Sequence, residues 1–139
     1  MQKGNQEPYQ FSNQLDIGFL NDLFEGDTEY ATTVFADFLK HIPSYWGDVS
    51  TAFENKNLPA LKSSVHKCKT LFGYVGHTDV LEIFQSFETK CGEVTNVDDL
   101  KSDYNNLQKK QESANLIVEQ EYQRLKKYHQ SFWLWIALL

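Results

Sequence analysis

His66 and two flanking lysines, Lys62 and Lys69, form the part of this sequence best suited to chemistry. Inside one helix, spacings of four and three residues bring their side chains onto one face. A neutral imidazole nitrogen is a competent nucleophile for phosphorus, and a lysine one turn away can offset negative charge on a phosphorylated product. The three residues therefore indicate a phosphoryl acceptor. The plainer alternative is a histidine and two lysines that only contact solvent.

Two glycines, Gly73 and Gly76, continue this face toward the end of the same expected helix. Glycine inside a helix costs about 1 kcal/mol relative to alanine, so Gly73 indicates that another molecule approaches the backbone closely. The alternative is that Gly73 lets Phe72 or a neighbouring helix pack closely within the protein.

The surroundings of His66 are basic, although the protein as a whole is acidic. From residue 55 to residue 78 there is no Asp or Glu, and the lysines there are Lys56, Lys62, Lys67 and Lys69. Such a patch suits an acidic partner or a bound phosphoryl group. Because an exposed, convex site cannot exclude water, His66 fits the substrate of another protein's active site better than it fits an enzyme pocket.

Apolar residues recur at helical spacing in several segments, and no segment shows the alternation of a strand over a useful length. The expected helices cover residues 16–25, 28–54, 58–75, 79–91 and 97–129. Pro43 is expected to kink the second helix or to start a new segment, since proline clashes with the preceding turn. Thr78 or Asp79 is expected to cap the fourth helix.

The third of these segments has one clear apolar seam, formed by Leu58, Leu61, Val65, Cys68, Phe72 and Val75. Burying this seam turns His66 outward, because the histidine lies on a different side of the helix. Together the segments predict an all-α fold, an antiparallel up-and-down four-helix bundle with an additional short N-terminal helix.

The composition fits one domain of 139 residues, of which 41% are hydrophobic, enough for a core. The net charge of −6 argues against a nucleic-acid binder, which needs a basic surface to displace counterions from phosphate. Two cysteines, Cys68 and Cys91, are too few for a disulfide framework or a four-thiolate zinc site. Reduced thiols, a cytoplasmic location and no bound metal are therefore expected.

The two ends of the chain differ from its middle. Residues 1–13 are polar and are predicted to be a flexible lead-in, residues 14–129 to form the bundle, and residues 130–139 to form an apolar tail. A membrane-spanning helix needs about 20 apolar residues, so no membrane insertion is expected from this tail. A packed helix end, a dimer contact and a segment added by cloning remain open for it. We expect a monomer, with a dimer through the tail as the alternative, and Met1 favours a stand-alone protein.

The string HKCKTLFGYVG, residues 66–76, resembles the phosphorylation motif of histidine-containing phosphotransfer (HPt) domains. In that motif a helical histidine is followed at plus three by lysine and at plus ten by glycine, here His66, Lys69 and Gly76. The similarity extends over residues 16–125 and includes a GD turn and an FL pair before the motif. The family often has glycine directly after the lysine, where this sequence has Thr70.

The resemblance implies a carrier of phosphoryl groups between receiver-domain aspartates in a phosphorelay. His66 would be the phosphoryl acceptor and Lys69 would stabilise the phosphoryl charge. The residues expected to dock the receiver are Lys62, Lys67, Thr70, Gly73 and Gly76. The expected partners are response-regulator receiver domains and a hybrid sensor histidine kinase. No cofactor is expected on this chain, magnesium is expected on the receiver, and no autonomous kinase activity is expected. The alternative is a pseudo-HPt adaptor that binds receiver or kinase domains without phosphotransfer.

Overall fold

The computed structural model describes residues 7–138, and all of its regular secondary structure is helical. The elements are α1 (Ile17–Phe24), α2 (Thr28–Glu54), α3 (Leu58–Tyr74), α4 (Thr78–Cys91), the short 3-10 helix η2 (Val97–Leu100) and α5 (Lys101–Ala137). The predicted all-α fold is confirmed.

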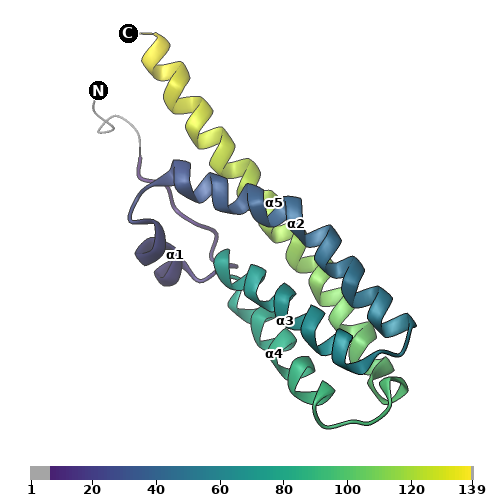
Figure 1. The fold of residues 1–139 in the computed structure, drawn as a ribbon. Helices are drawn as coiled ribbons and strands as arrows, with labels where there is room; N and C mark the ends of the chain where they lie inside the picture. The colour runs from purple at the N-terminus through teal and green to yellow at the C-terminus, as the bar shows by residue number, and fades with distance from the viewer. Residues whose placement is uncertain (1–6, 139) are drawn as a thin grey trace.

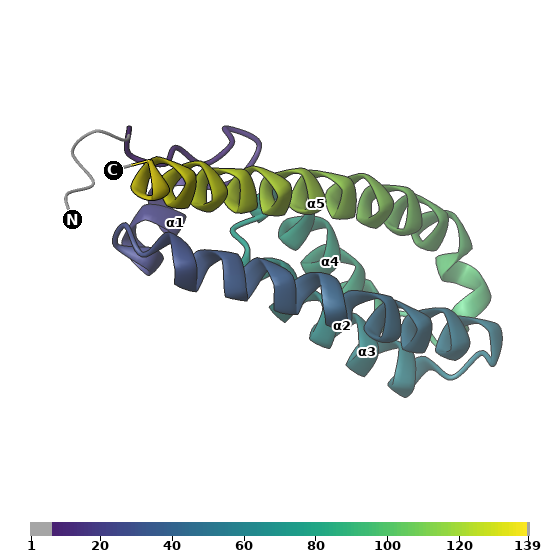
Figure 2. The same ribbon diagram turned by 90° about the horizontal axis from the view of Figure 1, so that it is seen from above.

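Four helices form an up-and-down bundle (Figure 1). In ring order α2 packs on α3, α3 on α4, α4 on α5, and α5 back on α2. Short connections make consecutive helices antiparallel, as in other up-and-down bundles. Seen from above, α2 and α5 are the long helices, and α1 lies at the end of the bundle where α2 begins (Figure 2). The predicted four-helix bundle with an added short helix is therefore correct.

Polar residues at the helix starts explain where most of the helices begin. The side chains of Asp16, Asp27 and Asn57 accept hydrogen bonds from backbone N–H groups in the first turns of α1, α2 and α3. The predicted cap of α4 is wrong, because His77 occupies the N-cap position and its side chain makes no capping bond. The ring of His77 is instead buried in the protein.

The predicted seam of α3 lies in the centre of the bundle. Five of its six members, Leu61, Val65, Cys68, Phe72 and Val75, are fully buried, and Leu58 at the start of the helix is half-buried. The ring of Phe72 packs against Phe38 of α2, with centroids 4.9 Å apart, and against Phe84 of α4, with centroids 5.2 Å apart. Complete burial of one such side chain contributes about 2–3 kcal/mol. This packing fixes the rotation of α3 and so determines which of its residues face outward.

Helix α2 continues through Pro43 without a break, so the expected new segment does not occur. Proline inside a helix costs about 3 kcal/mol. Ile42 directly before it and Val49 beyond it are both buried in the core. Burial on both sides of Pro43 therefore holds the helix together.

Helix α5 extends to Ala137, beyond the predicted end near residue 129. The first part of the predicted apolar tail is thus the last two turns of this helix, where Leu134 is 61% exposed. Within the described residues, no helix is long and apolar enough to cross a membrane.

The segment before α1 packs on the bundle. Phe11 is buried in the core, and the backbone N–H of Ser12 donates a 2.9 Å hydrogen bond to the buried carboxylate of Glu121 in α5. The predicted flexible lead-in over residues 1–13 is therefore wrong for the part that the structure describes, and residues 1–6 lie outside it. Local sequence patterns do not predict this contact, because Ser12 and Glu121 are both polar and Phe11 is an isolated apolar residue.

Candidate functional site

His66 lies in the middle of α3 with its side chain directed to solvent, as the position of the apolar seam predicted. The side chain is 58% exposed. Its neighbour in the next turn, Thr70, is also exposed and donates its hydroxyl to the backbone carbonyl of His66 at 3.1 Å. The imidazole is thus open to a large partner while its own helix holds the backbone below it.

A carboxylate from the neighbouring helix contacts the imidazole. The two carboxylate oxygens of Glu88 in α4 lie 3.1 and 3.2 Å from Nδ1 of His66. An ionised carboxylate only accepts hydrogen bonds, so Nδ1 must carry the hydrogen in this contact. The lone pair of a neutral imidazole is then on Nε2, the other ring nitrogen. Within residues 7–138, the hydrogen bonds of His66 leave Nε2 without a protein partner.

Lys69 is held by α4 and does not extend into solvent. Its ammonium group lies 2.9 Å from a carboxylate oxygen of Glu88 and donates a 2.7 Å hydrogen bond to the amide oxygen of Gln85. The side chain is only 17% exposed. We expected Lys69 to be directed at a phosphoryl group on His66. In the unphosphorylated protein the lysine instead contacts the carboxylate of Glu88, which also contacts the imidazole.

Glu88 stays ionised because of these partners. Its partial burial alone would raise the pKa of the carboxyl group. The hydrogen bonds from Lys69 and His66 outweigh this effect and lower the pKa below its ordinary value. Gln85, Glu88, Lys69 and His66 thus form one polar chain, which we call the Glu88 cluster.

The other predicted docking lysines are on the surface, but the basic patch is less positive than its sequence indicated. Lys62 and Lys67 are exposed, on opposite sides of His66 by the helical rotation of about 100° per residue. Glu88 reaches the patch from α4 and neutralises one of its charges. Among the described residues, no group of three or more His, Cys, Asp or Glu side chains is placed to hold a metal ion.

The chain was compared with known proteins. A crystal structure of the HPT domain from the Hpt sensor hybrid histidine kinase of Shewanella matches it with a TM-score of 0.60, over 85% of this chain and 95% of that chain. The fold is that of an HPt domain. The two sequences are 16% identical, so this similarity shows a shared fold and nothing about shared function. No model of a known protein family matches the chain, and no curated protein matches its sequence.

Within this HPt fold, the two predicted docking glycines have different surroundings. Gly73 is half-buried beside α4, and a Cβ there would lie 3.5 Å from Leu81, at ordinary contact distance. The expectation that it faces solvent is therefore wrong, although the site has room for a methyl group. Gly76 is buried and has a φ of +67°, and a Cβ there would lie 2.9 Å from the side chain of Leu20.

Gly76 therefore serves the fold, and the prediction that it docks a receiver is wrong. Its carbonyl accepts a 2.8 Å hydrogen bond from the backbone N–H of Asp16. Only glycine adopts this left-handed conformation without strain. The residue closes the turn between α3 and α4 and seats α1 against it.

Sequence reasoning missed Glu88 and Gln85, which the HPt fold places next to the predicted histidine and lysine. Both residues could have been found by counting outward from the turn between α3 and α4. In an antiparallel helix pair that turns at residue 77, residues equally far before and after the turn lie side by side. That rule pairs residue 66 with residue 88, and residue 69 with residue 85.

Proposed function

We propose that this chain is a phosphorelay carrier, in which His66 accepts a phosphoryl group from a receiver-domain aspartate and passes it to another receiver. The observation that carries the proposal is the state of the imidazole. Its Nδ1 is bound to Glu88, and among the described residues Nε2 has no hydrogen-bond partner on a side chain that is 58% exposed. An exposed nucleophile with a fixed tautomer suits a reaction in which the partner supplies the rest of the active site.

The proposed phosphoryl transfer needs only the imidazole of His66 and the aspartyl phosphate of the receiver. The lone pair of Nε2 attacks the phosphorus of the receiver's aspartyl phosphate, an N–P bond forms, and the P–O bond to the aspartate breaks. The aspartate leaves as a carboxylate, and no proton needs to move. The ring gains positive charge as the N–P bond forms, and the carboxylate of Glu88 at Nδ1 stabilises that charge. The reverse sequence returns the phosphoryl group to a second receiver.

In this proposal Lys69 acts mainly on Glu88. Its ammonium group keeps the carboxylate ionised and in position, and Gln85 holds the ammonium group.

The exposed Lys62 and Lys67 would attract the acidic pocket of a receiver. We expect the receiver to supply magnesium, and a hybrid sensor histidine kinase to be the source of the phosphoryl groups. We expect no kinase activity from the chain alone and place it in the cytoplasm with those partners.

The decisive experiment is incubation of the protein with phosphorylated receiver domains, followed by mapping of the modified residue. We expect an acid-labile, base-stable label on His66. His66→Gln should abolish the label and leave the helical circular-dichroism spectrum unchanged. The matched control is His129→Gln, which changes a histidine on α5 and should label normally.

Two results would contradict the proposal. Normal labelling of His66→Gln would assign the phosphoryl group to another residue. Receiver binding without transfer to any histidine would favour the pseudo-HPt adaptor, in which His66 is incidental.

A further inference from the structure

A cavity opens at the end of the bundle where the N-terminal segment, the α1–α2 turn and α5 come together (Figure 1). Its volume is about 610 Å³, within the range of about 300–1,000 Å³ that small-molecule sites occupy. The lining is drawn from residues 8–11 of the N-terminal segment, residues 21–28 around the turn, and Tyr128 of α5. None of the described lining residues lies on α3, so the cavity is separate from the candidate phosphoryl acceptor.

Aromatic rings form the walls of this cavity. Phe11 and Phe24 are buried, and Tyr9 and Tyr128 are half-buried. The rings of Tyr9 and Tyr128 have their centroids 5.2 Å apart at an angle of 82°, so they make two nearly perpendicular walls. The faces of aromatic rings attract cations, and the guanidinium group of Arg124 already lies over the ring of Tyr9, 5.2 Å from its centroid. Walls of this kind suit an organic cation with an apolar body.

Two carboxylates supply negative charge to the same cavity. Glu25 and Asp27 both line it and are exposed. Asp27 uses one oxygen to accept a 3.0 Å hydrogen bond from the backbone N–H of Tyr30, and within residues 7–138 neither carboxylate belongs to an ion pair. No Lys or Arg is among the described residues that line the cavity. The lining therefore presents net negative charge to a ligand.

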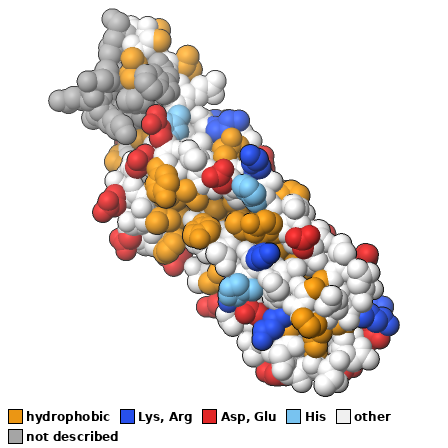
Figure 3. Space-filling view, viewed as in Figure 1, with side chains coloured by type: hydrophobic (Ala, Val, Ile, Leu, Met, Phe, Trp, Pro, Cys, Tyr) orange, Lys and Arg blue, Asp and Glu red, His pale blue; other side chains and the backbone are white. Residues whose placement is uncertain are grey.

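The segment around the cavity is acidic as a whole. From residue 4 to residue 39 the sequence contains seven Asp or Glu residues and no Lys or Arg. In the space-filling view, acidic side chains lie along the edge of the molecule near α1 (Figure 3). The cation beside Tyr9, Arg124, forms an ion pair with Glu121, which compensates its charge. Electrostatics at this end of the bundle therefore favours a cationic ligand over a neutral or anionic one.

The wall formed by Tyr9 is held in place before any ligand binds. Next to it, the backbone carbonyl of Gln10 accepts a 2.8 Å hydrogen bond from Arg124, and the ring of Phe11 is buried in the core. The backbone N–H of Ser12 is bonded to Glu121. A preformed wall loses little conformational entropy on binding, which leaves more of the contact energy as affinity.

Thr28 offers a hydrogen bond at the base of the cavity. It lines the cavity, is only 6% exposed, and its hydroxyl oxygen has no hydrogen-bond partner among the described residues. A buried polar atom without a partner costs free energy. A ligand N–H group that reaches this oxygen removes that cost, so the position favours a ligand that carries a hydrogen-bond donor.

We infer that this cavity binds a small organic cation, in which an ammonium group is attached to an aromatic or aliphatic body. The ammonium group lies against the rings of Tyr9 and Tyr128 and close to the two carboxylates, and the apolar body lies toward Phe24. The bound ligand joins the N-terminal segment, the α1–α2 turn and α5, so it stabilises the folded protein by mass action. The inference is independent of phosphotransfer at His66, because no residue of the Glu88 cluster lines the cavity.

The first test compares three probes that share a phenyl ring and differ in charge. They are 2-phenylethylammonium, 2-phenylethanol and phenylacetate, each titrated into the full chain and followed by backbone amide chemical shifts. We expect the cation to bind at least about tenfold more tightly than the alcohol, the anion not to bind, and the largest shifts to occur at Gly26 and Thr28. Equal affinity for the cation and the alcohol, or no binding of the cation, would overturn the inference.

The second test removes the groups that recognise the cation. Asp27→Asn and Glu25→Gln each delete one charge, and asparagine caps a helix as well as aspartate does. Each should weaken binding of 2-phenylethylammonium by about threefold, and Tyr128→Leu should weaken it by about tenfold. Glu29→Gln is the matched control, because Glu29 is exposed in the first turn of α2 but does not line the cavity. Equal weakening in this control would assign binding to general surface charge and overturn the inference.

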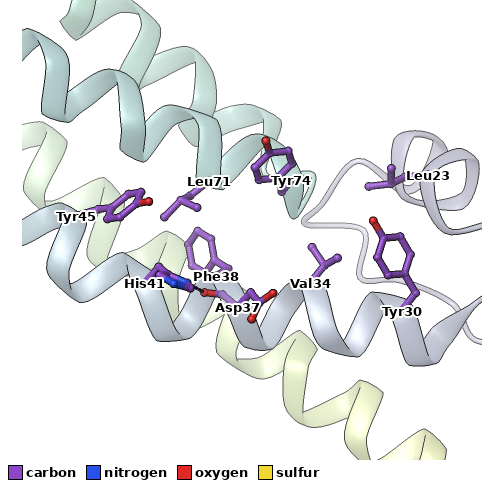
Figure 4. A pocket seen from close by; sticks show the side chains of 9 residues that line it. All are labelled: Leu23, Tyr30, Val34, Asp37, Phe38, His41, Tyr45, Leu71 and Tyr74. Atoms are coloured by element: carbon purple, nitrogen blue, oxygen red, sulfur yellow. Dashed lines mark hydrogen bonds between the residues drawn. The ribbon is translucent and has the colours of Figure 1, made fainter.

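A second apolar cavity provides the alternative location for the probe. It is the groove between α2 and α3, with Leu71 and Tyr74 in its lining (Figure 4). Tyr74→Ala should bind 2-phenylethylammonium within about twofold of the unchanged protein. Weaker binding in Tyr74→Ala together with unchanged binding in Asp27→Asn and Tyr128→Leu would place the probe in the groove and overturn the inference. Thermal melts identify any variant that loses its fold, and if Tyr128→Leu does so, the two charge variants decide.

Discussion

A carboxylate oxygen of Glu88 lies 3.1 Å from Nδ1 of His66, although 22 residues separate them in the chain. The contact joins α4 to α3 across the surface of the bundle. It assigns the ring hydrogen to Nδ1 and leaves Nε2 for chemistry. The reactivity of the exposed histidine is therefore set by a residue of another helix, which makes Glu88 the first position to test.

Removing the carboxylate should slow phosphotransfer without removing the acceptor. We expect Glu88→Ala to lower the rate of phosphoryl transfer to His66 by about tenfold, or roughly 1.4 kcal/mol of activation free energy. Glu88→Gln keeps an acceptor oxygen but has no charge. Its transfer rate should therefore lie between those of the unchanged protein and Glu88→Ala. Nitrogen chemical shifts of the imidazole provide the control, since they should report hydrogen on Nδ1 in the unchanged protein and a mixture of tautomers in Glu88→Ala. Unchanged shifts and rates would remove Glu88 from the mechanism.

Lys69 should contribute to both stability and transfer. A surface lysine usually changes stability by less than about 0.5 kcal/mol, but this one is largely buried between Glu88 and Gln85. We expect Lys69→Ala to lower the free energy of unfolding by about 1 kcal/mol, the usual value of such a hydrogen-bonded contact, and to slow transfer. Lys69→Met keeps the aliphatic stem and is the control for packing. Urea denaturation and transfer kinetics on both variants measure the two effects. A Lys69→Met protein with unchanged kinetics would limit the role of Lys69 to packing.

The two glycines of α3 should respond in opposite ways to alanine. At Gly73 the added methyl group meets Leu81 at an ordinary distance, so Gly73→Ala should be neutral or should stabilise by up to about 1 kcal/mol. At Gly76 the left-handed backbone and the close contact with Leu20 should make alanine cost at least about 2 kcal/mol. Thermal or urea denaturation of the pair checks this. Equal effects at both positions would contradict the structure.

Acidification should destabilise the protein through His77. Burial lowers the pKa of this imidazole from its ordinary value of 6.5, against a smaller opposing effect of the Asp79 carboxylate. The unfolded chain therefore takes up a proton that the folded protein does not, so stability is complete above about pH 6.5 and is lost as the pH falls below it. We expect the free energy of unfolding to fall as the pH is lowered through about 6.5, where the unfolded chain takes up the proton. His77→Leu should flatten this fall, and an equally steep fall in that variant would assign it to other groups.

Much of this fold was predictable because the spacing of apolar residues along the chain determines both where helices form and which side of each helix is buried. The seam of Leu61, Val65 and Phe72 repeats at helical spacing, and burying it leaves only one way for α3 to face. That rotation turns His66 outward and places Lys69 on its flank. The helix starts at Asp16, Asp27 and Asn57 follow from short polar side chains that can bond their own first turns.

Contacts between different helices could not be predicted from such local patterns. The sequence around His66 is basic and contains no acidic residue, yet Glu88 lies against the imidazole because the α3–α4 hairpin brings it there. Gly76 resembled a docking position, but its burial depends on Leu20, 56 residues earlier in the chain.

The sequence alone determined the helices and the face on which His66 lies, since both depend on residues within a few turns of one another. The tertiary structure alone decided which nitrogen of His66 is free, what Lys69 contacts and why Gly76 is a glycine. The physical reason is that a hydrogen bond or a van der Waals contact acts over a few ångströms. Residues far apart in the chain come within that range only when the helices have packed.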